Sequence, residues 1–312
     1  MTTFIVRRCA FAVVTLWAVL TLVFFIVRVV PGDPAQVILG EQATADAIAA
    51  MRTRLGLDRP LGVQYFEFLW GAVRGDWGTS LVTGRPVVQE VLSVLPWTIE
   101  LTLAALVIGA VTGIPLGVWA AVNRNRLTDY VVRLSSLLGL SFPAFVSGIL
   151  LLIFFSIQLR WAPVMSTQRD SFGEWLGALA LPAINLGLIM AAYITRVTRS
   201  AMLEVLSEDY VRTARAKGVP WRAVVWRHAL RNALIPIITI VGLYLGVLIG
   251  NSVLTEIVFN RPGLGKLIVG ALNQRDYTLL QGMMVIYTFI VIIVNLLTDL
   301  TYGAADPRVK LK

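Results

Sequence analysis

The sequence is short of the side chains that most enzymes use for chemistry. It contains one cysteine, Cys9, and one histidine, His228, which excludes an internal disulfide, a cysteine-based metal cluster and a histidine-rich metal site within the chain. It also has no phosphate-binding loop, because Gly263–Leu267 contains a Gly-Lys pair but lacks the upstream glycine and the hydroxyl residue of such a loop. We therefore expect no catalysis, no metal and no other cofactor in this chain.

Charge is scarce as well. Only 14% of the 312 residues are charged, against about 25% in a typical soluble domain. Hydrophobic residues make up 57% of the chain, and the mean hydropathy is +0.77. A chain of this composition cannot cover its surface with polar groups, so the sequence indicates a membrane protein.

Six apolar segments are long enough to span a bilayer, which requires about 20 residues of helix. The first follows Arg7 and Arg8, is too long for the apolar part of a signal peptide and has no cleavage pattern after it, so we interpret it as an uncleaved anchor. The fourth is short and contains Pro182. The predicted spans are Phe11–Val30, Thr98–Val122, Leu134–Leu159, Ala178–Thr195, Ala233–Thr255 and Met283–Ala304.

The distribution of basic residues predicts the orientation of these spans, because Lys and Arg favour cytoplasmic segments. With both termini in the cytoplasm, more than half of the 27 Lys and Arg residues fall on that side, and the largest group lies in 196–232. The first loop on the opposite face, 31–97, has five Arg against seven Asp and Glu. The prediction is an all-α protein with six transmembrane helices and cytoplasmic N- and C-termini.

The same pattern divides the chain into four parts. Residues 1–30 hold the N-terminus and first transmembrane helix, and residues 31–97 form an external helical loop. Residues 98–304 form a five-helix transmembrane core that includes the cytoplasmic segment 196–232, and residues 305–312 form a cytoplasmic tail.

The basic segment 196–232 is predicted to form a helical hairpin. We expect one helix from about Ser200 to Lys217 and a second from Trp221 into the fifth span, with Gly218 just after the first helix and Pro220 at the first position of the second. Small side chains near the end of the first helix would let another backbone approach closely. An ordinary basic loop is the simpler alternative, and a DNA-binding helix–turn–helix is disfavoured because the bilayer tethers both ends.

The predicted external segments contain helices of their own. Ala43–Leu55 has the pattern of an amphipathic helix with Thr44 as its N-cap, Val63–Val73 is aromatic-rich, and Leu267–Leu272 follows a Pro/Gly turn. These segments either cover the end of the bundle or dock a soluble partner, and both interpretations stay open. The residues assigned to docking are Tyr65, Phe68, Trp70, Arg261 and Pro262.

Polar residues within the spans are candidates for a translocation pathway, since they are expected to face the bundle interior. Hydrogen bonding between helices explains them equally well. They are Ser141, Pro143 and Ser147 in the third span, Asn185 and Tyr193 in the fourth, and Asn251 and Ser252 in the fifth.

Short motifs follow one another in a set order along the whole chain. They are PGDP (31–34), LGLDRPLGVQY (55–65), GDWGTS (75–80), RTARAKG (212–218), WRHALRNALIP (226–236), PGLG (262–265), RDY (275–277) and DPR (306–308). One of them alone would be a weak signal, but the ordered set is specific. It resembles the B-type inner-membrane permease subunits of ATP-binding-cassette (ABC) importers of the peptide/nickel branch, the dipeptide/oligopeptide permease family.

The resemblance implies the type I ABC importer permease fold, in which the hairpin is the "EAA" loop that inserts coupling helices into a groove of the ATPase subunit. Arg212 stands where the general pattern has Glu and Arg231 where it has Pro, while Ala214 and Gly218 match. The implied coupling residues are Arg212, Thr213, Ala214, Arg215, Ala216, Lys217, Gly218, Val219 and Pro220.

The resemblance also implies partners, namely a homologous second permease, two ATP-binding subunits that carry ATP and Mg, and an extracytoplasmic substrate-binding protein, with no role for nucleic acid. The implied location is the bacterial inner membrane. The implied cargo is a di- or oligopeptide, with nickel, glutathione or haem as alternatives. A secondary transporter is the competing class, but such proteins usually carry ionisable residues at mid-membrane, which this sequence nearly lacks.

Overall fold

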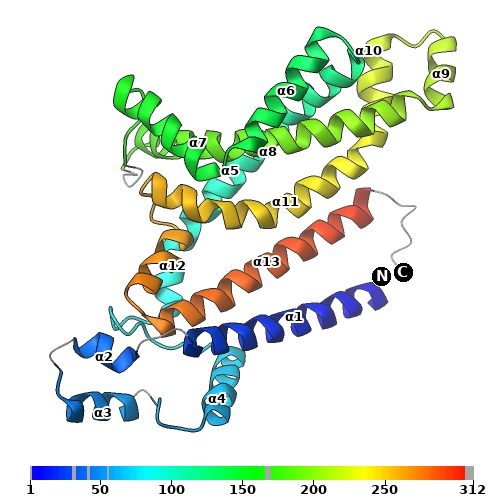
Figure 1. The fold of residues 1–312 in the computed structure, drawn as a ribbon. Helices are drawn as coiled ribbons and strands as arrows, with labels where there is room; N and C mark the ends of the chain where they lie inside the picture. The colour runs from blue at the N-terminus through cyan, green and yellow to red at the C-terminus, as the bar shows by residue number, and fades with distance from the viewer. Residues whose placement is uncertain (1, 30–32, 41–42, 55, 166–169, 306–312) are drawn as a thin grey trace. The chain divides into compact units, whose positions relative to one another are not determined.

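The computed structural model describes residues 2–29, 33–40, 43–54, 56–165 and 170–305. Within these ranges the regular structure is helical, and an isolated bridge between Thr79 and Pro86 is the one β-type pairing (Figure 1). The predicted all-α class is therefore confirmed. The DPR motif at 306–308, the predicted tail after Ala305, and the first two residues of the PGDP motif lie outside the described residues.

The chain folds into two compact units. Of the described residues, unit 1 contains those up to Pro96 and Gly263–Ile293, and unit 2 contains those in Trp97–Pro262 and from Val294 to Ala305. Two long helices, α5 (Val87–Val122) and α13 (Tyr277–Ala305), contribute residues to both units.

Unit 1 has an apolar cluster where the first turns of α5 meet α12 and α13, with Val87, Leu264 and Met283 among its buried residues. Gly282 permits this contact, since a Cβ there would lie 2.5 Å from a methyl group of Val87. Besides α5 and α13, the helices of unit 1 are α1 (Thr2–Val29), α2 (Pro34–Leu39), α3 (Ala45–Arg54), α4 (Leu61–Arg74) and α12 (Leu264–Asn273).

The three predicted helices of the external segments are present as α3, α4 and α12. Thr44 begins α3 as predicted, because its hydroxyl accepts the backbone N–H of Ala47 at 3.3 Å. Gly75, which follows α4, has a φ of +77° and lets the chain leave that helix in the left-handed conformation.

Unit 2 is a bundle in which α8 and α11 run side by side and α6 and α7 pack on α8 (Figure 1). Its core holds apolar residues of α5, α8 and α11, such as Leu101, Met190 and Ile237. Besides the greater part of α5, its helices are α6 (Leu127–Ser141), α7 (Ala144–Leu151), the π-helix η1 (Leu152–Gln158), α8 (Phe172–Leu206), α9 (Asp209–Ala216), α10 (Trp221–Ala223), the π-helix η2 (Val224–Ala229) and α11 (Leu230–Val258).

Helices α5 and α8 are in very close contact along a row of glycines. A Cβ at Gly113 would lie 2.8 Å from the carbonyl oxygen of Ala191, and a Cβ at Gly117 would lie 2.7 Å from that of Thr195. The Thr195 hydroxyl donates to the Gly113 carbonyl at 3.2 Å across the same contact. Small residues at a four-residue spacing are the usual means of packing helices tightly in lipid.

Four described helices are long and apolar enough to span a membrane, namely Val87–Val122, Phe172–Leu206, Trp221–Val258 and Tyr277–Leu296. They overlap the second, fourth, fifth and sixth predicted spans, and all four begin before the predicted apolar segment. The described apolar part of α1, Ala10–Ile26, is shorter. A count of six requires α1 and the third predicted span as well.

The third predicted span, Leu134–Leu159, is a bent pair of helices that together are long and apolar enough for one span. Helices α6 and α7–η1 meet at an angle of 101°. The break falls at Phe142, which has a φ of −95° and a ψ of 130° because the ring of Pro143 disfavours a helical conformation in the preceding residue.

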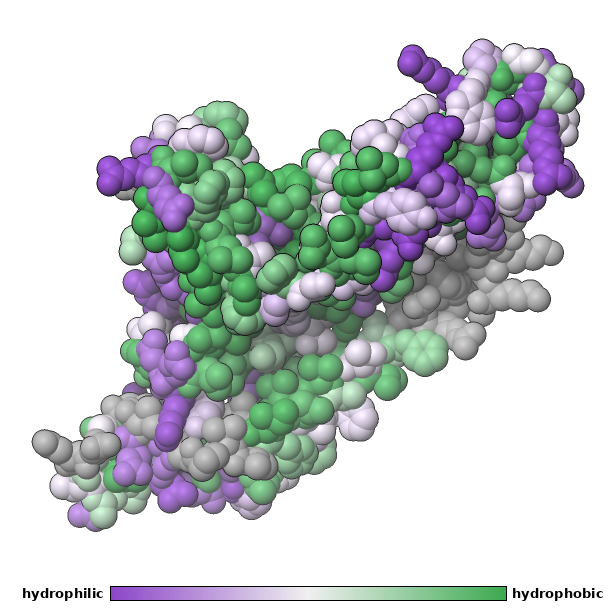
Figure 2. All heavy atoms as spheres, turned by 45° about the horizontal axis from the view of Figure 1, so that its top comes forward, coloured by the Kyte–Doolittle hydropathy of each residue, from purple (hydrophilic) through white to green (hydrophobic). Residues whose placement is uncertain are grey.

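Figure 2 shows hydrophobic residues over much of the surface and hydrophilic residues gathered around the α9–α10 end of unit 2. Many large apolar side chains of the long helices are exposed, including Val111 on α5 at 67% and Leu134 on α6 at 60%. Such faces are stable in lipid or against other apolar helices and unstable in water.

Candidate functional site

The exposed polar site of unit 2 is the hairpin of α9 and α10. The expectation of one helix from Ser200 to Lys217 is wrong, because α8 continues to Leu206 and α9 is a separate short helix. The chain leaves α8 at Ser207, whose hydroxyl donates to the Glu204 carbonyl at 2.7 Å, and Glu208 is extended with a ψ of 147°. Because α8 ends at Leu206 and α9 begins at Asp209, the axis of α9 turns away from that of α8.

Helix α9 is attached to the bundle on one side only. Val211 is buried at 2% exposure, and the Tyr210 hydroxyl accepts a hydrogen bond of 2.7 Å from Asn232 on α11. Ala214 is half-buried. The remaining predicted coupling residues of this helix and its end are exposed, namely Arg212, Thr213, Arg215, Ala216, Lys217 and Gly218.

The turn after α9 is closed by its own backbone. Gly218 donates to the Arg215 carbonyl at 2.9 Å and Val219 donates to the Ala214 carbonyl at 3.2 Å, which is the Schellman arrangement. The predicted position of Gly218 just after the helix is therefore confirmed. Gly218 has a φ of +82° and no atom within 4 Å of a Cβ built on it, so backbone conformation rather than space favours glycine here.

Two further features make this turn stiff. Pro220 has a φ of −55° and a ψ of 137° and stands just before α10, so the prediction that it occupies the first helical position is wrong by one residue. The Arg215 guanidinium lies 5.0 Å from the centre of the Trp221 ring across the turn. Beyond Trp221, α10, η2 and α11 follow one another without a break, as predicted for the second helix.

A buried ion pair lies at the base of the hairpin. The Arg199 guanidinium of α8 binds both carboxylate oxygens of Asp129 on α6, at 2.6 and 2.8 Å. Asp129 is fully buried and also accepts the Asn125 backbone N–H at 3.0 Å. Sequence reasoning did not identify this pair; the signal was a single acidic residue in an otherwise basic part of the chain.

Two of the predicted pathway residues are brought together by the bend of the third span. The Ser147 hydroxyl donates to the Asn185 side-chain oxygen at 2.7 Å, and the Asn185 amide donates to the Ala144 carbonyl at 2.9 Å. Asn185 is 1% exposed. These bonds hold the start of α7 against α8, immediately after Pro143.

The other predicted pathway residues are spread along the bundle. The Tyr193 ring of α8 lies against the Tyr244 ring of α11 with their centres 4.0 Å apart, and the Arg196 guanidinium lies 5.8 Å from the Tyr193 ring. Ser252 is buried and donates to the Ile249 carbonyl of its own helix. Asn251 is exposed, and so is Ser141, which donates to the Leu137 carbonyl of α6.

A second polar cluster of unit 2 includes Arg261, which was assigned to docking. Arg261 is 1% exposed, donates to the Trp97 carbonyl at 3.2 Å and pairs with Glu100 at 3.1 Å. Nearby, Glu256 is fully buried and accepts the Thr98 hydroxyl at 2.6 Å. A buried arginine cannot line a docking surface, so its assignment is wrong; Pro262 beside it is half-buried.

The three predicted docking aromatics of α4 differ in their surroundings. Tyr65 and Phe68 pack against Phe24 of α1 with ring centres 5.2 and 5.7 Å apart, and the Tyr65 hydroxyl lies 2.7 Å from that of Thr21. Trp70 is 59% exposed. Tyr65 and Phe68 therefore hold α4 on α1, whereas Trp70 is free to contact another molecule.

The described residues contain no group of three or more His, Cys, Asp or Glu side chains that could hold a metal ion. What they contain is a bundle of long apolar helices with an exposed basic hairpin, which is typical of a polytopic membrane protein.

Comparison with known proteins identifies the family. Residues 113–311 match the family described as "Binding-protein-dependent transport system inner membrane component", and residues 1–102 match the N-terminal family of such membrane components. The chain belongs to this family. It is thus a permease subunit of an ABC importer, as the motifs predicted, and a multi-pass protein of the inner membrane.

Individual relatives agree with this assignment. The chain is 42% identical to the glutathione transport system permease protein GsiC of Salmonella choleraesuis (strain SC-B67) and 41% identical to that of Escherichia coli (strain K12), over 100% of both chains. A structure of the MetNI methionine ABC transporter in an inward-facing conformation matches with a TM-score of 0.57 over 69% of this chain and 95% of that chain. At 19% identity, that match shows the fold alone.

Proposed function

We propose that this chain, paired with a homologous second permease, forms the pathway by which short peptides cross the inner membrane, with the tripeptide glutathione as the first candidate. Two separate ATP-binding subunits hydrolyse ATP with Mg, and an extracytoplasmic binding protein delivers the cargo. The chain itself carries out no chemistry. Its 42% identity to a glutathione permease protein over the full length supports the choice of cargo.

The α9–α10 hairpin is the observation that carries the coupling role. Apart from the half-buried Ala214, its residues from Arg212 to Lys217 are exposed, while Val211 and the Tyr210–Asn232 bond attach it to the bundle. Because the turn at Gly218 is closed and α10 continues into α11, a displacement of α9 moves α11 as well, with no flexible loop between them. An ATPase that moves this hairpin therefore moves the two long helices that it joins, α8 and α11.

The orientation follows from the same hairpin. Its exposed arginines and lysine support a cytoplasmic position of the α9–α10 end, and with the six crossings that we propose both termini lie in the cytoplasm as well. The ATP-binding subunits are cytoplasmic, so a basic exposed surface on this side also offers complementary charge to an acidic groove.

On the opposite side we propose that the binding protein docks on the exposed face of α4. Trp70 and its neighbour Phe66 are 59% and 70% exposed, which is unusual for large aromatic residues unless they meet lipid or a partner. Within the bundle, Tyr193 with Tyr244, and Asn185 with Ser147, are the polar groups we assign to the pathway. The remaining candidates for the pathway are Ser141, Pro143, Asn251 and Ser252.

The function is tested by uptake into proteoliposomes that contain the assembled transporter with ATP in the lumen. Radiolabelled glutathione with its binding protein should accumulate only when ATP is present. Accumulation without ATP, driven by an ion gradient, would place the protein among secondary transporters and reject the proposal. Uptake of other short peptides but not of glutathione would be consistent with the importer role and would refute glutathione as the cargo.

Coupling is tested separately by Ala216→Trp, which places a large side chain on the exposed face of α9. Uptake should be lost because the indole prevents close approach of the ATPase backbone. The two permeases, the ATP-binding subunits and the binding protein should still assemble. The matched control is Ala47→Trp, an exposed alanine of α3 in unit 1. Normal uptake by a well-assembled Ala216→Trp transporter would show that α9 does not lie in the interface with the ATPase.

A further inference from the structure

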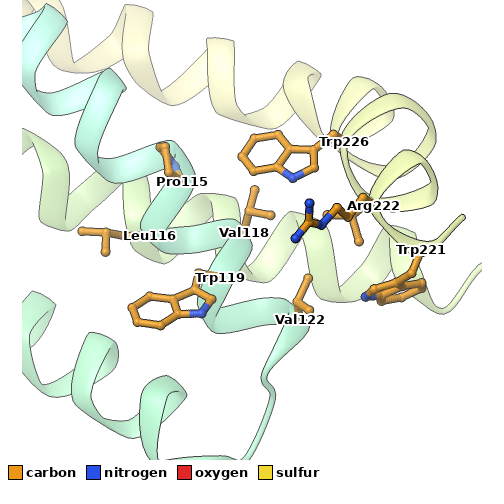
Figure 3. Close-up of a pocket in the computed structure, with 9 residues that line it drawn as sticks. Pro115, Leu116, Val118, Trp119, Val122, Trp221, Arg222 and Trp226 are labelled. Atoms are coloured by element: carbon orange, nitrogen blue, oxygen red, sulfur yellow. The ribbon is translucent and has the colours of Figure 1, made fainter.

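A groove of about 390 Å³ lies in unit 2 between the end of α5 and the start of the α10–η2 segment. Figure 3 shows Trp119 and Val118 on one side and Trp221, Arg222 and Trp226 on the other. The proposed pathway uses none of these side chains, and the coupling hairpin uses only Trp221, whose ring lies beside Arg215. The lining is apolar apart from Arg222 and the indole nitrogens.

The three tryptophans are large aromatic groups that the chain leaves uncovered. Trp119, Trp221 and Trp226 are 52%, 41% and 52% exposed, and among the described residues none of their indole N–H groups has a hydrogen-bond acceptor. Tryptophan is enriched where the hydrocarbon meets the headgroups, because its ring prefers the apolar layer and its N–H prefers polar partners. The position in the chain agrees, since α5 ends at Val122, just before the basic α5–α6 loop.

The charge in the groove is positive and unmatched. Arg222 is exposed and has no carboxylate partner among the described residues, and none of the nine lining residues is acidic. In Figure 3 its guanidinium extends from α10 across the groove toward Val118 of α5. A guanidinium beside an apolar wall complements a ligand that has a phosphate at one end and hydrocarbon at the other.

We propose that this groove binds an anionic phospholipid of the membrane leaflet on the hairpin side. Arg222 contacts the phosphate, the indole N–H groups donate to headgroup or glycerol oxygens, and the exposed Leu116 side chain contacts an acyl chain. Basic residues close to the end of a transmembrane helix are a known means of recognising anionic lipid. The inference does not depend on the cargo of the transporter or on the partner that α9 contacts.

The test is native mass spectrometry of the assembled transporter titrated with phosphatidylglycerol, phosphatidylcholine or inorganic phosphate. The wild type should retain phosphatidylglycerol at lower concentration than phosphatidylcholine. Arg222→Gln should weaken phosphatidylglycerol binding roughly fivefold, the effect of one interfacial arginine, and Arg222→Lys should restore most of it. The matched control is Arg227→Gln, an exposed arginine of η2 that does not line the groove.

Wild-type retention of phosphatidylglycerol by Arg222→Gln would overturn the proposal. So would displacement of the lipid by an equal concentration of inorganic phosphate, which would indicate an anion site without lipid character. If Arg222→Gln does not assemble, Trp119→Leu tests the same groove from α5 and should also weaken phosphatidylglycerol binding. A Leu116→Cys variant on a Cys9→Ser background that cross-links to the second permease would show that protein covers the groove, and would likewise overturn the inference.

Discussion

Two arginines of unit 2 lie next to a tryptophan ring at almost the same distance, yet they have different roles. Arg215 of the hairpin lies 5.0 Å from Trp221 and is exposed. Arg261 lies 4.9 Å from Trp97, is 1% exposed and also binds Glu100 and a backbone carbonyl. In the hairpin the ring only stiffens a turn and the charge remains available to a partner. In the buried cluster the charge is neutralised within the chain, and its role is structural.

The comparison extends to the other charged groups of the unit. Asp129 and Arg199 are paired inside the protein. Among the described residues, the ion pair of Arg212 is an exposed contact of 3.4 Å with Asp209, one turn away on the same helix. Exposed pairs of this kind contribute little to stability, while loss of one partner of a buried pair leaves an uncompensated charge. Substitution of a buried charge should therefore lower the stability of the protein, whereas substitution of an exposed charge in the hairpin should affect coupling to the ATPase.

The largest effect is expected from Arg261→Ala. This change removes a large, fully buried side chain together with its bonds to the Trp97 carbonyl and Glu100, and the resulting cavity and unpaired groups should destabilise the protein by about 3–5 kcal/mol. The measurement is thermal unfolding of the assembled transporter. Arg215→Ala is the control, since it removes an arginine from a similar ring contact at an exposed site. Equal melting temperatures for the two variants would show that the buried and the exposed arginine do not differ in their contribution to stability.

A smaller loss is expected from Asp129→Asn. Arg199 is 20% exposed and can reach water after the change, so we expect a cost of about 1–3 kcal/mol rather than the full cost of a buried charge. The double variant Asp129→Asn with Arg199→Gln should be more stable than the sum of the single changes predicts. Strict additivity, measured by unfolding of all three variants, would show that the pair contributes no coupling energy.

Gly218→Ala tests the turn of the hairpin with a still smaller change. An alanine at a φ of +82° costs about 1 kcal/mol, so the observed turn should be populated roughly fivefold less. We expect ATP-driven uptake to fall while the melting temperature of the transporter stays near that of wild type. Gly84→Ala, at a φ of +69° in unit 1, is the matched control for strain alone. Equal losses of uptake in both variants would argue against a special role for the hairpin turn.

The smallest effect on stability is expected from Arg212→Ala. Its side chain is exposed, so the melting temperature should not change measurably. If Arg212 contacts the ATPase, stimulation of ATP turnover by the loaded binding protein should fall. Unchanged stimulation would show that the Arg212 charge does not take part in coupling, which would then depend on the small residues of α9.

Much of this architecture was predictable because its signals are local. The scarcity of charge indicated a membrane protein, and apolar runs located most of the long helices. Thr44 marked the start of α3, and Gly218 marked the turn after α9, since caps and turns depend on a few neighbouring residues. The hairpin between two apolar helices was likewise evident from the order of residues along the chain.

Other features were decided by contacts between residues far apart in the sequence. Asp129 meets Arg199, and Glu100 meets Arg261 across 161 positions, so the burial of these charges could not be inferred from their neighbours along the chain. The groove of Trp119 and Arg222 likewise exists only because α5 ends beside α10. Composition, apolar runs and caps determined the class and the helices of this protein. Only tertiary packing decided which of its charges are neutralised inside the bundle and which remain exposed for a partner, because burial depends on neighbours in space.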